Sequence, residues 1–73
     1  MKIHMKIMVK GIVQGVSFRQ YTKNKAQELG ICGFVQNLST GDVLIHAEGT
    51  RESIQQLVDW CHYGSPRSKV TDV

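Results

Sequence analysis

The sequence predicts an α+β domain, in which an antiparallel sheet carries two helices on one face. Three observations lead to this prediction: two segments with helical spacing of apolar residues, four extended apolar-rich segments, and glycines at the joints between them. A chain of 73 residues supports a single hydrophobic core. We therefore expect one domain over residues 1–73, with the element order β-α-β-β-α-β.

The first strand and the first helix are distinguished by their apolar period. Up to Gly11, alternate positions are apolar, as in a strand with one buried face: Ile3, Met5, Ile7 and Val9. Residues 11–18 then form a loop with two glycines. From Arg19 to Leu29 the spacing becomes helical, and Gly30 follows where a helix C-terminus favours glycine.

The second half of the chain supplies the remaining elements. Two strands, residues 32–38 and 43–48, flank a turn in which Gly41 can adopt positive φ. Thr50 is a suitable N-cap for a second helix, whose apolar face comprises Ile54, Leu57, Val58 and Cys61. Residues 64–66 end that helix, and residues 70–73 begin a fourth strand that is cut short. This order is the split β-α-β, or ferredoxin-like, arrangement.

Composition narrows the functional classes without choosing among them. The net charge of +3 suits an anionic partner, either a phosphate compound or nucleic acid, but the basic residues are scattered. Cys32 and Cys61 lack metal-site or disulfide-scaffold spacing, so we expect two buried, reduced thiols. We find no membrane span and no signal peptide, and we expect a cytoplasmic protein. His4 and His46 have no third partner for a metal.

The loop Gly11–Arg19 is the first candidate for chemistry. A glycine-bearing loop between a strand and a helix N-terminus can direct several backbone N–H groups at one anion. Arg19 can add a planar, two-pronged donor, and Gly15 allows close approach of the ligand. The loop lacks the Lys-Ser/Thr ending of a P-loop, which disfavours nucleotide binding. By itself, the pattern is more often a purely structural turn with a surface arginine.

Asn37 is the second candidate. In a split β-α-β fold, the second strand lies within reach of the loop that precedes the first helix. The carboxamide of Asn37 cannot act as a general base, but it can hold a water molecule through one acceptor and two donors. Taken alone, an asparagine in a strand is more often an ordinary hydrogen-bonding residue.

Taken together, three patterns closely resemble the acylphosphatase family. They occur in the family's order and cover nearly the whole chain. The patterns are Gly11-x-Val13-Gln14-Gly15-Val16-x-Phe18-Arg19, Gly33-Phe34-Val35-x-Asn37-x-x-x-Gly41-x-Val43 and Gly64-x-Pro66-x-x-x-Val70-x-x-Val73.

The resemblance implies hydrolysis of the carboxyl-phosphate bond of a small acyl phosphate, giving a carboxylate and inorganic phosphate without metal or organic cofactor. It implies that Arg19 binds the phosphate and that Asn37 orients the attacking water. It also implies a phosphate cradle formed by the backbone N–H groups of Gln14, Gly15, Val16, Ser17, Phe18 and Arg19.

Two alternatives remain open from the sequence. One is a non-catalytic acylphosphatase-like domain of a larger maturation protein. The other is an RNA-binding module of the same topology, which is disfavoured because the third strand carries no aromatic side chain on which bases could stack. We expect no nucleic-acid partner. We expect a monomer, with dimerisation by strand-edge pairing as the alternative, since a short fourth strand leaves the first strand exposed.

Overall fold

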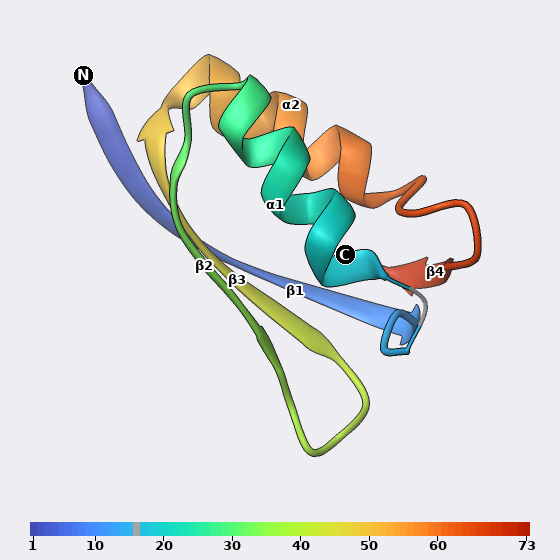
Figure 1. Cartoon of the computed structure of the whole chain (residues 1–73). Coiled ribbons are helices and arrows are strands. Elements are labelled where there is room, and N and C mark those ends of the chain that lie inside the picture. Colours follow the sequence, from blue (N-terminus) through green and yellow to red (C-terminus); the bar gives the residue numbers. More distant parts are fainter. Residues whose placement is uncertain (16) are drawn as a thin grey trace.

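The computed structural model of the chain describes residues 1–15 and 17–73. The predicted element order and fold class are confirmed. The elements are β1 Lys2–Ile12, α1 Phe18–Glu28, β2 Cys32–Asn37, β3 Val43–Thr50, α2 Arg51–Cys61 and β4 Lys69–Asp72. Figure 1 shows the two helices covering one face of the sheet. In the described ranges, neither helix is long and apolar enough to cross a membrane.

The sheet is antiparallel throughout, with the strand order β2-β3-β1-β4. Val43, at the start of β3, pairs with Val9 of β1 on one side and with Asn37 of β2 on the other. β2 ends at Asn37, one residue before the predicted end at residue 38. The short β4 pairs with residues 10–12 of β1, with a register shift between Lys10 and Gly11.

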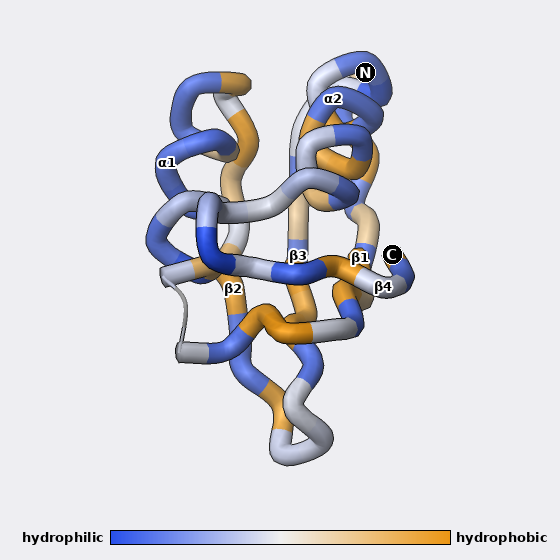
Figure 2. The backbone as a smooth tube through the Cα atoms, turned by 90° about the vertical axis from the view of Figure 1, so that its right-hand side faces the viewer, coloured by the Kyte–Doolittle hydropathy of each residue, from blue (hydrophilic) through white to orange (hydrophobic). Residues whose placement is uncertain are grey.

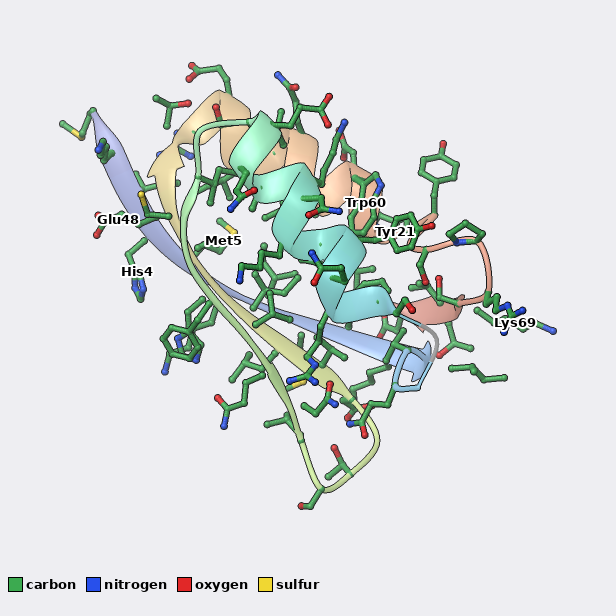
Figure 3. All side chains as sticks on the ribbon, in the orientation of Figure 1. His4, Met5, Tyr21, Glu48, Trp60 and Lys69 are labelled. Atoms are coloured by element: carbon green, nitrogen blue, oxygen red, sulfur yellow. The ribbon has the colours of Figure 1, made fainter. Side chains whose placement is uncertain are left out.

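The core lies between the sheet and the helices. Its buried apolar side chains come mostly from β1, β3 and α2: Ile7, Val9, Val13, Phe18, Ile31, Val43, Ile45, Ala47, Ile54, Leu57 and Cys61. Met5 points to the helix side (Figure 3) but is 38% exposed. α1 buries only Phe18 and Thr22, and Figure 2 shows it as hydrophilic along most of its length. This helix therefore packs less extensively than α2.

The helix ends use the residues that the sequence indicates. At the C-terminus of α1, Gly30 has a φ of 72°, and the Ile31 N–H donates to the Ala26 carbonyl at 2.8 Å. This is a Schellman-type ending, in which glycine avoids the steric cost of positive φ. At the N-terminus of α2, the Thr50 hydroxyl accepts from the Ser53 N–H at 3.1 Å. The N-cap prediction is confirmed.

The opposite face of the sheet is not covered by the helices. His4 points away from them (Figure 3), and the ring of Phe34 stacks on His46 at a centroid distance of 4.2 Å. Cys32 lies in phase with Phe34 on β2 and is exposed, whereas Cys61, the last residue of α2, is fully buried. The prediction of two buried thiols is thus correct for Cys61 and wrong for Cys32, because no element covers this face of β2.

The two thiols should differ sharply in reactivity. Burial raises the pKa of the Cys61 thiol to about 12, and the thiolate is the reactive form. With an aromatic disulfide reagent at pH 8, we expect one fast thiol per chain, Cys32, while Cys61 reacts only on unfolding. Cys32→Ser should abolish the fast phase. Equal rates for both thiols would contradict the burial of Cys61.

The same burial makes stability depend on pH. Between the ordinary thiol pKa of 9.0 and about 12, the folded chain keeps the Cys61 proton that the unfolded chain releases. The stabilisation that the buried, protonated thiol contributes to the free energy of unfolding is therefore fully present below pH 9. It falls as the pH rises from 9 toward 12. From pH 8 to 10, the unfolding free energy of the parent should fall by about 1 kcal/mol more than that of Cys61→Ala. Parallel guanidinium titrations at both pH values would measure this, and identical pH dependence would contradict it.

Candidate functional site

A single groove, about 920 Å³ in volume, brings the two candidate regions together. Its lining includes Gly15 and Ser17 of the loop, Arg19 in the first turn of α1, and Asn37 at the end of β2. These residues come from two stretches of chain, because residues 15–19 are contiguous and Asn37 lies 18 residues beyond Arg19. The antiparallel sheet brings them together, because the last residues of β1 and β2 and the first residues of β3 lie at the same end of the sheet.

The loop is held at both ends by buried side chains. Val13 and Phe18 are each 1% exposed, and the Phe18 ring lies 5.6 Å from that of Trp60 on α2. Between these anchors, Gly15 and Ser17 are exposed and have left-handed φ values of 72° and 62°. Positive φ is uncommon for serine and occurs frequently at functional sites. The buried anchors on either side therefore leave Gly15 and Ser17 at the surface.

One residue of the predicted cradle, Val16, lies outside the described residues. The others are all described, and Gln14, Gly15, Ser17, Phe18 and Arg19 all line the groove. The left-handed conformation at Ser17 has no signal in the sequence, since serine adopts it rarely.

The N-terminus of α1 differs from that of α2 in a way that favours an anion. α2 has the Thr50 cap and an acidic residue, Glu52, in its first turn. α1 has neither a side-chain cap from Ser17 nor an acidic residue in its first turn. Its first N–H groups and the positive end of its dipole are therefore uncompensated by side chains and directed at the loop.

Arg19 and Asn37 also have free polar groups. In the described part of the chain, neither side chain makes a hydrogen bond or an ion pair, and both residues are exposed. Asn37 lies in phase with Val35 on β2, opposite Val43, and thus on the helix side of the sheet. A guanidinium and a carboxamide bordering one groove can together contact an oxyanion and a water molecule.

The side chain of Gln14 makes contacts that its place in the sequence does not indicate. Only its backbone was assigned to the cradle, yet its side-chain amide donates to the carbonyl oxygens of Leu38 at 2.7 Å and Asp42 at 2.8 Å. These acceptors are 24 and 28 residues away, in the β2–β3 turn. Nothing in the local sequence around Gln14 indicates so distant a contact.

Metal-binding side chains do not gather in the described ranges: no group of three His, Cys, Asp or Glu residues there could hold an ion. His4 and His46 have ring centroids 6.3 Å apart and form only a pair.

Comparison with known proteins gives one consistent family. The family model described as acylphosphatase matches residues 5–73. A protein of Geobacter sulfurreducens named acylphosphatase is 48% identical over 73 residues, which are 100% of this chain and 80% of that protein. The crystal structure of acylphosphatase from Bacillus subtilis has a TM-score of 0.93 and 42% identity, covering 99% of this chain and 79% of that one.

A further solved structure, of full-length HypF in the phosphate- and nucleotide-bound form, has a TM-score of 0.89 and 32% identity. The match covers 99% of this chain but only 10% of that one. The same fold is therefore present as a small part of that much longer protein.

If the loop binds an anion, adding a methyl group at Gly15 should lower the affinity for that anion. Gly15 and Gly30 share a φ of 72°, and a Cβ added at either would have no atom within 4 Å. Substituting alanine at either site should lower the free energy of unfolding by about 1 kcal/mol, because alanine disfavours positive φ. Gly15→Ala should also weaken binding of inorganic phosphate by about tenfold or more, the contribution of one hydrogen bond to a charged group.

Gly30→Ala is the matched control, because it changes the same backbone conformation at the far end of α1. Calorimetric titration with phosphate and urea denaturation would measure both effects. Equal phosphate affinities for the two variants would contradict anion binding at Gly15.

Proposed function

This chain belongs to the acylphosphatase family, and on that premise we propose which of its residues bind and hydrolyse the acyl phosphate. The reaction cleaves the carboxyl-phosphate bond and releases a carboxylate and inorganic phosphate. Arg19 and the loop backbone form the phosphate-binding site, and Asn37 positions the water. The observation that carries this assignment is one groove lined by both side chains, neither of which makes a hydrogen bond or an ion pair within residues 1–15 and 17–73.

The loop supplies most of the phosphate contacts. Backbone N–H groups from Gln14 to Arg19, together with the uncapped N-terminus of α1, face the phosphate oxygens. The guanidinium of Arg19 adds a bidentate contact. Phosphoryl transfer depends mainly on positioning and on stabilising charge at the equatorial oxygens, so such a cradle supplies the principal catalytic effect.

Asn37 acts on the other reactant. Its carboxamide accepts from the water and keeps it in line with the bond to be broken. The departing carboxylate is a good leaving group, since its conjugate acid has a pKa of about 4. The reaction therefore needs no side-chain acid, and a phosphate oxygen of the substrate takes the water's proton.

Function as a monomer is part of this proposal, because the groove that brings Arg19 and Asn37 together is formed within one chain and needs no second copy. The two cysteines, one exposed and one buried, are both free thiols. Free thiols persist in reducing compartments, which supports a cytoplasmic location. Size-exclusion chromatography over a range of concentrations and cell fractionation would test these two points.

Arg19→Ala and Asn37→Ala should each lower kcat/KM for a simple aromatic acyl phosphate by about 100-fold or more, because the first removes the bidentate donor to the phosphate and the second removes the group that positions the water. Activity of the parent should survive EDTA, since the proposed site uses no metal. Arg51→Ala, at the start of α2, and Asn24→Ala, on the exposed side of α1, should retain parental rates. Circular dichroism would establish that each variant is folded.

The activities of the parent and of the variants distinguish a non-catalytic domain, a wrong residue assignment and a metal-dependent mechanism. A folded parent without activity would favour a non-catalytic domain. An active parent with active Arg19 and Asn37 variants would overturn the residue assignment but keep the family activity. Loss of activity in EDTA, restored by a divalent ion, would require a metal in the mechanism.

A further inference from the structure

The side chain of Gln14 links the loop to the turn between β2 and β3. Gln14 is half-buried, and its single amide nitrogen donates to both ends of the turn, Leu38 O at 2.7 Å and Asp42 O at 2.8 Å. A primary amide has two N–H donors, so both are used here. Figure 1 shows the loop after β1 and the β2–β3 turn at the same end of the molecule.

The same two carbonyl groups also close the turn. The Leu38 oxygen accepts from the Gly41 N–H at 3.1 Å, and the Asp42 oxygen accepts from the Leu38 N–H at 2.9 Å. Gln14 therefore binds to the hydrogen-bonded network that defines the turn. A shift of the turn relative to the loop would break both of its bonds.

This network adjoins Asn37 directly. Leu38 follows Asn37 in the chain, and Asp42 precedes Val43, the strand partner of Asn37. The β1–β3 pairing ends at Val9, before the loop begins. Within residues 1–15 and 17–73, the two bonds of Gln14 are the hydrogen bonds that join the loop to this turn.

We propose that Gln14 is a positioning residue, whose side chain fixes the distance between the phosphate cradle and Asn37. This inference rests on the proposed function, because it assumes that the cradle holds the phosphate and Asn37 the water. Gln14 does not touch the reacting atoms through its side chain. It keeps the water in line with the phosphorus by holding the two segments in one arrangement.

The chemistry of the side chain predicts distinct effects for three substitutions. Gln14→Met keeps the length but has no donors. Gln14→Asn keeps the donors but is shorter by one carbon–carbon bond, about 1.5 Å. Gln14→Glu places a carboxylate against two carbonyl oxygens at neutral pH and offers one O–H donor when protonated.

We expect Gln14→Met to lower kcat by about tenfold to 100-fold, in proportion to the misplacement of the water. KM should change less than about threefold, because Arg19 and the cradle backbone are retained. Gln14→Asn should be intermediate. The kcat of Gln14→Glu relative to the parent should rise as the pH falls, since protonation restores one donor. Gln55→Met, which removes a comparable exposed amide bond to Asp59 on α2, is the matched control and should resemble the parent.

A double-mutant cycle with Asn37 separates positioning from general stability. In the Asn37→Ala background, Gln14→Met should change kcat less than about twofold, because the group that it positions is gone. An active parent in which Gln14→Met has the same effect in both backgrounds, or no effect, would overturn the inference and leave the proposed function intact. An inactive parent would overturn the proposed function.

Hydrogen exchange tests the link independently of activity. In folded Gln14→Met, the Leu38 and Gly41 amide protons should exchange at least about tenfold faster than in Gln55→Met, because both lie in the network that Gln14 closes. Unchanged exchange would overturn the inference whether or not the chain is active. If Gln14→Met fails to fold, Gln14→Asn supplies the same comparison at smaller amplitude.

Discussion

The antiparallel pairing of β1 with β3 is the constraint on which the site depends. The last residues of β1 pair with the first residues of β3, so the loop after β1 and the turn before β3 lie at the same end of the sheet. Val43 sits at this junction, paired with Val9 and with Asn37. If β2 slipped by one residue along β3, Asn37 would turn to the uncovered face of the sheet and away from the groove. Core packing along β3 prevents such a slip, since every second side chain of β3 is buried.

Between residues 13 and 19, buried side chains that anchor the loop alternate with exposed residues that can donate hydrogen bonds. Val13 and Phe18 are buried, whereas Gly15, Ser17 and Arg19 are exposed between and beside them. The local rules of helix stability are met at α2 and are not met at the start of α1, where cap and acidic residue are both absent. Departures of this kind from local consistency are typical of functional sites. Here they leave N–H groups available to an anion.

The features of the groove that favour an anion are local and do not follow from the net charge of the chain. The overall charge of +3 comes from scattered residues and includes no basic run. What distinguishes the groove is a guanidinium without an ion-pair partner in the described ranges, next to an uncompensated helix N-terminus. By contrast, Lys25 on the same helix pairs with Glu28 at 3.7 Å. The proposed phosphate site therefore does not depend on a strongly charged surface.

The sequence alone determined the order of elements and the identity of the site candidates. Alternating and helical periods place side chains on faces, Thr50 and Gly30 mark helix ends, and the motif resemblance singles out Arg19 and Asn37. These features depend on residues that are close together in the sequence, so they can be read without the tertiary structure. Only the tertiary structure decided that Cys32 is exposed, because it depends on which sheet face the helices cover. It likewise decided the contact of the Gln14 amide with a turn 24 residues away, since non-local pairing leaves no local signal.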